Sequence, residues 1–274
     1  MVCGMNTTAR TTVKTWGAGP VEAALLPRAP YDVAYTPERT VAGFAFDIQC
    51  GQHAFAGDRL RPFTTMPHSL ALTPAGCDIR SASETGGEYL TVTITPGSES
   101  RYVEMFDAAR LYQRSNAANP AGRKIAQQLR RQLLSAARDD AATEEAAVRL
   151  FEVAVAADVP NAKPATSITP ARLRQFHDLL EARFADALSV TEMASTLGLS
   201  VAYFIRAFTA ATGTTPHACL MDRRISAARQ ALANTAMPMA AVALAAGFSS
   251  QAHMASVFRA RLGITPGAYR AAAS

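Results

Sequence analysis

The C-terminal part of the chain presents one pattern twice. Between Leu188 and Tyr269 a short apolar run, a glycine turn, a serine and an amphipathic run follow one another, and the same order returns 49 residues later up to the turn and 50 residues later beyond it. The turns are Leu197-Gly198-Leu199-Ser200 and Ala246-Gly247-Phe248-Ser249. Because a serine after such a turn can cap the next helix, each copy predicts two helices joined by a turn. This is the helix-turn-helix design, in which the second helix enters the major groove of DNA.

Three segments of this region resemble the DNA-binding domain of the AraC/XylS transcription regulators. They are Val190–Ala194 with the first turn, Ala245–Gln251, and the tail Phe258–Arg270. One helix-turn-helix pattern is a weak signal, whereas two at this spacing, joined by an apolar and basic run, are specific. The resemblance implies a transcription regulator, in most members an activator, with double-stranded DNA and RNA polymerase as partners.

Charge is distributed unevenly along the chain. Residues 1–157 carry 16 Lys and Arg against 16 Asp and Glu, whereas residues 158–274 carry 11 against 6, so the whole net charge of +5 belongs to the repeat region. A basic domain beside a neutral one fits a polyanionic partner, although ordinary surface charge would give the same count.

The cysteine spacing and the hydropathy indicate the compartment. The four cysteines form no CxxC pair and have no metal-ligand spacing, which is typical of reduced thiols in the cytoplasm. No apolar stretch is long enough to span a bilayer. We therefore expect a cytoplasmic protein with no membrane partner.

The region from Val13 to Thr95 alternates apolar and polar residues in short stretches that Gly and Pro turns separate. Examples are 44–48, 70–72 and 89–94. Short strands at this pitch predict a small sandwich or barrel. In outline the region resembles the cupin-like sensor domain of many AraC-type regulators, which implies a β-barrel that binds a small-molecule effector. The sequence identifies no effector-binding residue.

After the predicted barrel, apolar residues recur at helical spacing over 125–133 and 148–155, which predicts a helical hairpin. The cations expected to border its apolar stripe are Arg123, Lys124, Arg130 and Arg131. Such a hairpin can pack on its own barrel or on a second subunit. The corresponding helices of AraC-type regulators often form a dimer contact, so the resemblance implies a homodimer.

The sequence thus predicts an α+β protein with two domains. Residues 1–157 form a cupin-like sensor and dimerisation domain, a β-barrel with a helical hairpin. The proline-rich residues 158–170 form a linker. Residues 171–274 form an all-α DNA-binding domain with two helix-turn-helix motifs. In the helix that joins the motifs, about Pro216 to Asn234, Leu220, Ile225, Ala228 and Leu232 are expected to point inward, and Arg223, Arg224 and Arg229 partly outward.

Each predicted reading helix has an apolar face and an exposed face. The first begins at Ser200 and turns Phe204 and Phe208 to the core, and the second begins at Ser249 or Ser250. The second is expected to bury Met254, Phe258 and Leu262. The base-reading candidates are Ala202, Tyr203, Ile205, Arg206, Gln251, His253 and Ser256. The phosphate-binding candidates are Ser200, Ser249, Ser250, Arg259 and Arg261.

Arg206 is the main base-reading candidate, because a guanidinium can donate two parallel hydrogen bonds to guanine O6 and N7. AraC-type proteins often place a base-reading arginine at this position, and a solvated or phosphate-bound arginine is the alternative. Ala202 and Ile205 could contact thymine methyl groups, and Tyr203 could bind a phosphate through its hydroxyl.

The second reading helix departs from the family pattern, since Ser256 stands where the family frequently has arginine. We therefore expect this helix to anchor phosphates, through Ser250, Arg259 and Arg261, more than to select bases. Gln251 suits adenine but could equally meet a phosphate at the helix start. His253 could equally be an ordinary surface imidazole.

Two alternatives remain open at this stage. An architectural DNA-binding protein without effector control would also need the basic domain. A cupin-type metalloenzyme fused to a DNA-binding domain would need convergent His and carboxylate ligands. Only His53 and His68 lie in the predicted barrel, fifteen residues apart and without an HxH pair, and no phosphate loop or Ser/His/Asp arrangement is present. The sequence predicts no catalytic residue, no metal and no cofactor, and therefore no enzyme.

Overall fold

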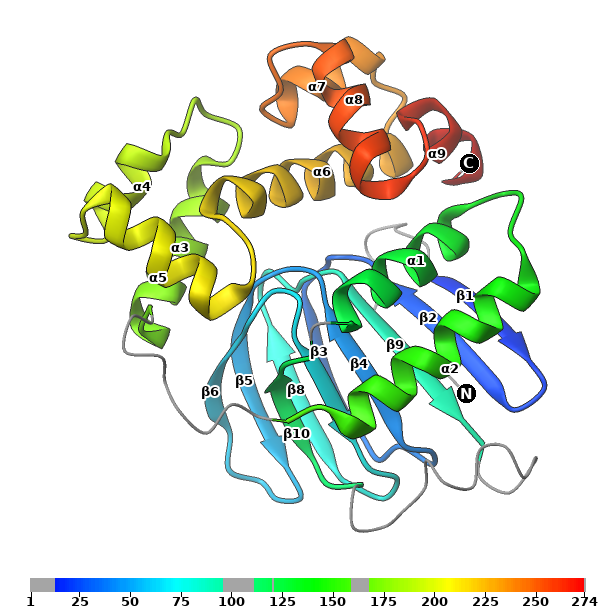
Figure 1. Ribbon diagram of the computed structural model, residues 1–274. Coiled ribbons are helices and arrows are strands. Elements are labelled where there is room, and N and C mark those ends of the chain that lie inside the picture. The colour runs from blue at the N-terminus through cyan, green and yellow to red at the C-terminus, as the bar shows by residue number, and fades with distance from the viewer. Residues whose placement is uncertain (1–12, 96–110, 120, 159–167, 274) are drawn as a thin grey trace. The chain divides into compact units, whose positions relative to one another are not determined.

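A computed structural model of the 274-residue chain describes residues 13–95, 111–119, 121–158 and 168–273 (Figure 1). The chain divides into two compact units, with the division after Asn161. The described part of the first unit holds ten strands and two helices, and that of the second holds seven helices. The architecture is mixed α+β, as the sequence predicted.

The strands of the first unit are short, as their alternating pattern predicted. They are β1 (Lys14–Ala18), β2 (Val21–Leu26), β3 (Tyr31–Tyr35), β4 (Val41–Ala45), β5 (Gln49–Phe55), β6 (Arg61–Thr65), β7 (Leu70–Thr73), β8 (Ile79–Ser83), β9 (Tyr89–Ile94) and β10 (Arg114–Ala117). All their pairings are antiparallel. The predicted strands over 70–72 and 89–94 are confirmed, whereas the one over 44–48 ends at Ala45.

The strands form two sheets, in the orders β1-β2-β9-β4-β7-β10 and β3-β8-β5-β6. The pairings nest, since β2 pairs with β9, β3 with β8, β4 with β7 and β5 with β6. Nesting of this kind is typical of a double-sheet jelly roll. Among the described residues no pairing joins the two sheets. The unit is therefore a sandwich, one of the two architectures that the strand pattern predicted, and the β-barrel that the family resemblance implied was wrong. Alternating apolar residues occur in sandwiches and barrels alike, because both bury one face of each strand.

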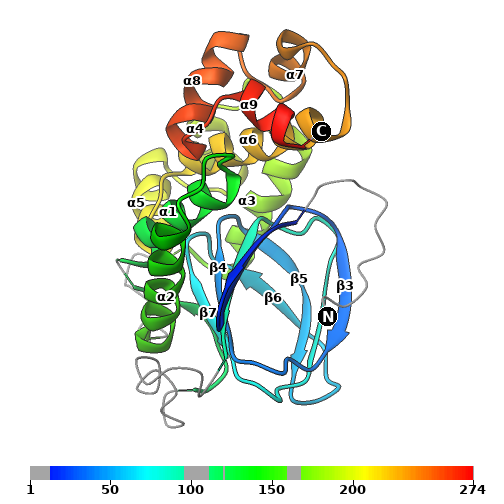
Figure 2. The same cartoon turned by 90° about the vertical axis from the view of Figure 1, so that its right-hand side faces the viewer.

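The predicted helical hairpin is present as α1 (Gly122–Leu134) and α2 (Asp140–Ala156). Asp139 caps α2 by accepting hydrogen bonds from the amides of Ala141 and Ala142, so the helix begins directly after it. Helix α2 contacts β2, β4, β7 and β9, and the six-stranded sheet therefore lies between the hairpin and the second sheet (Figure 2). The apolar stripe of the hairpin therefore packs on the sheet of its own chain.

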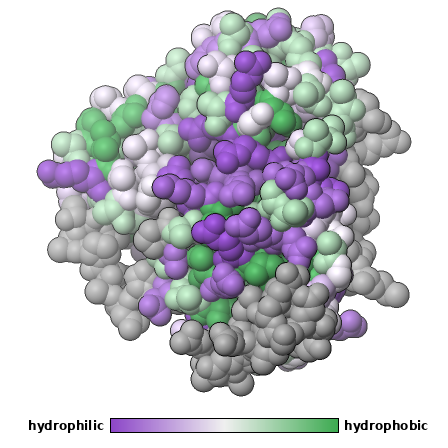
Figure 3. All heavy atoms as spheres, turned by 45° about the vertical axis from the view of Figure 1, so that its right-hand side comes forward, coloured by the Kyte–Doolittle hydropathy of each residue, from purple (hydrophilic) through white to green (hydrophobic). Residues whose placement is uncertain are grey.

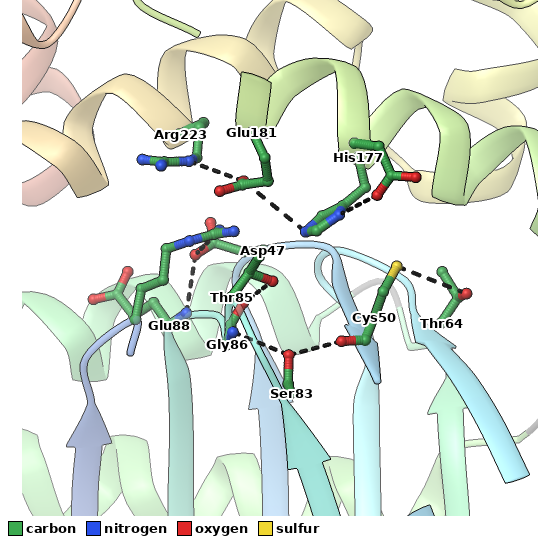
Figure 4. Close-up of polar contacts among 12 residues, drawn as sticks. Asp47, Cys50, Thr64, Ser83, Thr85, Gly86, Glu88, His177, Glu181 and Arg223 are labelled. Carbon is green, nitrogen blue, oxygen red and sulfur yellow. Dashed lines mark hydrogen bonds and ion pairs between the residues drawn. The ribbon is translucent and has the colours of Figure 1, made fainter. Parts of the chain in front are cut away.

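Buried ion pairs attach α1 and the loops to this sheet. Arg130 binds the carboxylate of Glu88, and its guanidinium lies 4.4 Å above the ring of Phe46. Arg28 lies 3.5 Å from Asp47, whose carboxylate also accepts the amide of Glu88 (Figure 4). Arg130 is only 8% exposed, so it lies within the buried face of the helix and not at the border of the stripe, where it was predicted. It lies four residues from Ala126 and Leu134, both buried, and so shares their face.

The helices of the second unit are α3 (Pro170–Arg183), α4 (Val190–Thr196), α5 (Val201–Thr212), α6 (Pro216–Asn234), α7 (Met239–Ala245), α8 (Gln251–Leu262) and α9 (Pro266–Ala273). Thr169 caps α3, and Pro170 occupies its first turn, where a missing amide hydrogen leaves no hydrogen bond unmade. The predicted linker thus reaches the first residue of α3, and its residues 159–167 lie outside the described part of the chain.

The surface of the molecule is mixed. Hydrophilic side chains dominate the face in Figure 3, with smaller apolar patches between them. Over the described ranges no single helix is long and apolar enough to cross a membrane. The bent pair α4 with α5 meets the length and composition criteria only when the two helices are taken together.

Candidate nucleic-acid interface

Helix α6 carries one helix-turn-helix motif near each end. Helices α4 and α5 lie towards its N-terminal end, and α7 and α8 towards its C-terminal end (Figure 1). With 19 residues, α6 is about 28 Å long. That length is close to the roughly 34 Å that separates two reading helices one turn apart on DNA.

The first motif forms for local reasons. Ser189 and Glu192 make a reciprocal capping box at the start of α4, and the side chain of Ser200 accepts the amide of Tyr203 at the start of α5. Helix α5 ends at Gly213, which has the left-handed φ of 67°. Its inner face is apolar, and the rings of Phe176, Phe204 and Phe208 pack edge to face at centroid distances of 4.7 to 5.7 Å.

The second motif repeats this design with one difference. Pro238 precedes α7 without a side-chain cap, so this helix lacks the capping box of α4. Ser250 caps α8 by accepting the amide of His253, which settles the choice between the two serines. The hydroxyl of Ser249 lies instead 3.1 Å from Nδ1 of His253. The side chains of Met254, Phe258 and Leu262 are fully buried, as predicted.

The structure leaves nearly all the predicted DNA-contacting side chains at the surface. Fully buried Phe204 and Phe208 stand on the opposite face of α5 from Ala202, Ile205 and Arg206, which are exposed. Tyr203 is half-buried at the flank. On the second motif the exposed candidates are Ser249, Ser250, Gln251, His253, Ser256 and Arg259. Ser200 is exposed as well, beside the start of α5.

The three candidate arginines differ in their partners. The guanidinium groups of Arg206 and Arg259 make no hydrogen bond or ion pair with any residue that the structure describes. Arg261 is half-buried and binds the carboxylate of Asp222 in α6. Asp222 neutralises much of the charge of Arg261, so Arg259 is the better phosphate-binding candidate of the two.

The arginines of α6 were predicted to point partly outward, and for two of them this was wrong. Arg224 is 8% exposed and Arg229 is 6% exposed. Arg224 lies four residues from both Leu220 and Ala228, so helical periodicity placed it on the inner face. Burial lowers the pKa of Arg224 from its usual value. Its guanidinium donates to the carbonyls of Phe184 and Asp186 at 2.7 and 2.6 Å.

Arg223, in the same turn of α6, makes a further polar contact. Its Nε donates to Oε1 of Glu181 at 2.9 Å, and Glu181 lies 3.9 Å from Nε2 of buried His177 (Figure 4). These contacts stay within the second unit. They join α6 to α3, the helix that braces the first motif.

The histidines of the first unit have aromatic neighbours. His53 stacks on Phe63 at 4.8 Å and meets the edge of Phe55 at 4.7 Å, and burial lowers its pKa. The ring of His68 lies 6.2 Å from that of Phe44. Within the described ranges, no three His, Cys, Asp or Glu side chains come together as a metal site.

Comparisons with known proteins agree with the geometry of the second unit. A family model described as "Helix-turn-helix domain" matches residues 193–272. The chain is 32% identical over 91 residues to the probable transcriptional regulator LumQ of Photobacterium leiognathi, covering 33% of this chain and 37% of LumQ. It is 33% identical over 95 residues to the virulence regulon transcriptional activator VirF of Yersinia enterocolitica, covering 35% and 34%. These matches span about a third of the length of the curated relatives.

Among solved structures, the chain is similar to a transcriptional regulator with an AraC-type DNA-binding domain from Chromobacterium violaceum. The identity is 33%, the TM-score is 0.37, and the match covers 38% of this chain and 93% of the other. The curated relatives are named as transcription regulators rather than as enzymes. The C-terminal unit of this chain therefore contains a helix-turn-helix domain, which the family model matches over residues 193–272.

Proposed function

We propose that this protein is a sequence-specific, DNA-binding regulator of transcription, and that it acts as an activator in the cytoplasm. One observation carries the proposal. The apolar faces of α5 and α8 are buried, while their other faces present exposed side chains that include Arg206 and Arg259. A helix that is anchored on one face and polar or small on the other suits entry into a major groove.

The two helices are assigned different tasks in this proposal. Helix α5 reads bases through Arg206, with Ala202 and Ile205 against thymine methyl groups and Tyr203 at a phosphate. Helix α8 anchors the backbone through Ser250 and Arg259, and Gln251 is its main base-reading side chain. The remaining candidates of the second motif, Ser249, His253 and Ser256, border the same exposed face, and Ser200 and Arg261 are the remaining phosphate candidates.

The first unit is proposed to be a cupin-like sensor and dimerisation domain. Its nested strand pairing is that of a double-sheet jelly roll, an architecture that cupins share. Because the apolar stripe of α1 and α2 is buried on the sheet, a homodimer through this hairpin would use exposed side chains such as Lys124, Arg131 and Glu152. An effector that binds this unit changes DNA binding only through different affinities for two states of the protein.

The names of the curated relatives also support activation, which requires contact with RNA polymerase as well as with DNA. The experiment that tests DNA binding is selection of duplexes by the full chain from a random library, followed by affinity measurements at several salt concentrations. We expect a recurrent sequence that binds at least a thousandfold more tightly than random DNA, the usual lower limit for specific regulators. A library that emerges without a recurrent sequence would overturn the proposal and favour an architectural DNA-binding protein.

Effector control and the oligomeric state have separate tests. The affinity for the selected duplex is measured with and without candidate small molecules, and no change across a broad panel would count against a sensor. Sedimentation equilibrium of the free protein reports the dimer, and a monomer at all accessible concentrations would contradict it. Run-off transcription from a promoter that carries the selected sequence distinguishes activation from repression.

A further inference from the structure

One turn of α6 contacts the second helix-turn-helix motif and also α3, the helix that braces the first motif. Asp222, Arg223 and Arg224 follow one another in the sequence, and we call them the bridging triplet. Arg223 and Arg224 bind the C-terminal end of α3 and the residues that follow it, and α3 braces the first motif through the ring of Phe176. Asp222 binds Arg261 of α8, which belongs to the second motif. Three neighbouring side chains therefore tie the two motifs to one helix.

The contact of Arg224 uses an unsatisfied helix end. The last carbonyls of a helix have no partner within it, and a cation at that end is favourable. Arg224 donates Nε to the carbonyl of Phe184, the C-terminal cap of α3, and Nη2 to that of Asp186. Arg223 lies with its guanidinium 3.9 Å above the ring of Phe184, so both arginines hold the same helix end.

The turn of the second motif is in close contact with the C-terminal end of α3 and with Arg224. A Cβ atom at Gly247 would lie 2.8 Å from Cα of Ala185, 2.8 Å from the carbonyl oxygen of Phe184 and 2.9 Å from Nε of Arg224. Two of these atoms are backbone and cannot move away as a flexible side chain would. Gly198, its counterpart in the first motif, has no atom within 4 Å of such a Cβ. Only the second turn thus needs glycine for close approach.

We propose that the bridging triplet and Gly247 set the distance and angle between α5 and α8, and so determine which spacing of the two half-sites on DNA the protein accepts. This inference rests on the proposed function. Besides this attachment, α7 and α8 are held to α6 by the connection at 235–238, by direct packing on α6 and by α9, which contacts both α6 and α8. Since one base pair advances DNA by about 3.4 Å, a displacement of a few ångströms changes the preferred spacing.

The test on DNA uses the full chain and a series of the selected duplex whose half-site spacing grows or shrinks by one base pair at a time. The wild-type protein is expected to prefer one spacing. In Gly247→Ala the affinity ratio between the preferred spacing and the others is expected to fall about tenfold, or the preferred spacing is expected to move by one base pair. The reason is that the backbone atoms of 184 and 185 must separate from the turn. Arg224→Lys, which keeps the charge but not the paired donors, is expected to have a smaller effect in the same direction.

Gly198→Ala is the matched control. Both turn glycines have positive φ, +62° and +81°, so an alanine is strained at either position, but only Gly247 is in close contact. Gly198→Ala should lower stability and keep the wild-type spacing preference. Should Gly247→Ala fail to fold, Arg224→Lys carries the test, and Arg224→Met should then enlarge the loss of preference.

A readout without DNA separates this inference from the proposed function. Spin labels on azidophenylalanine at the exposed positions Ala210 of α5 and Ala260 of α8 report the distance between the two helices in the free protein. We expect a single narrow distribution for the wild type and Gly198→Ala, and a shifted or broader one for Gly247→Ala. An unchanged distribution together with an unchanged spacing preference overturns the bridging role. A wild-type protein that binds no duplex overturns the proposed function instead.

Discussion

Replacing Arg206 by alanine tests the base-reading assignment most directly. The side chain is exposed on α5 and has no partner among the described residues, so its removal breaks no contact that holds the fold. We expect the free energy of unfolding to change by less than about 0.5 kcal/mol, as at other surface positions. Any large loss of DNA affinity would then come from the interface itself.

The size of that loss follows from the hydrogen bonds at stake. A bidentate arginine–guanine contact discriminates against the wrong base by about 1–3 kcal/mol. At about 1.4 kcal/mol per tenfold, this corresponds to roughly 5- to 150-fold weaker binding of the selected duplex. On random DNA the variant loses only one cationic charge, so the loss there should be much smaller.

The assay is fluorescence anisotropy with the selected duplex, with random DNA and with duplexes in which the pair opposite Arg206 carries each other base. The wild type should reject the substituted duplexes, and Arg206→Ala should bind all of them with similar affinity. If Arg206→Ala lost equal affinity for selected and random DNA, base reading by Arg206 would be refuted and a phosphate contact would be the remaining role. Thermal unfolding of both proteins confirms that the fold is unchanged.

Three further changes test the remaining assignments. Arg259→Ala should weaken selected and random DNA alike and reduce the salt slope by about one; a loss on selected DNA alone would contradict a phosphate role. Glu88→Gln should destabilise the first unit by about 3–5 kcal/mol in denaturant titrations, because it removes the carboxylate that balances the buried charge of Arg130. Phe208→Ala should cost the second unit about 3–5 kcal/mol, and a cost below 1 kcal/mol would mean that the ring cluster is not its core.

Much of the second unit could be predicted from the sequence because the signals are local. A capping serine, a glycine turn and apolar residues at helical spacing act within a few residues. Ser200 and buried Phe258 were therefore predicted correctly, and the cap of α8 was narrowed to Ser249 or Ser250. The repeat added a second, independent signal for the same motif. The exposed face of α5 followed from its buried face by geometry alone.

The buried arginines show where local reasoning failed. Arg130 was predicted at the border of the apolar stripe and Arg224 partly outward, yet both are buried. Their spacing from buried neighbours pointed inward, but the partners that make burial possible, Glu88 and the carbonyls at the end of α3, are distant in the sequence. The helical spacing of both arginines therefore indicated that they are buried.

By itself the sequence determined the doubled motif, the two reading helices and the faces that they expose, because these depend on contacts within a turn or two of helix. Only the tertiary structure decided that the strands form two open sheets and that Gly247 meets the end of α3. Both depend on pairings between distant segments, and one residue pattern is compatible with several such pairings until the chain packs.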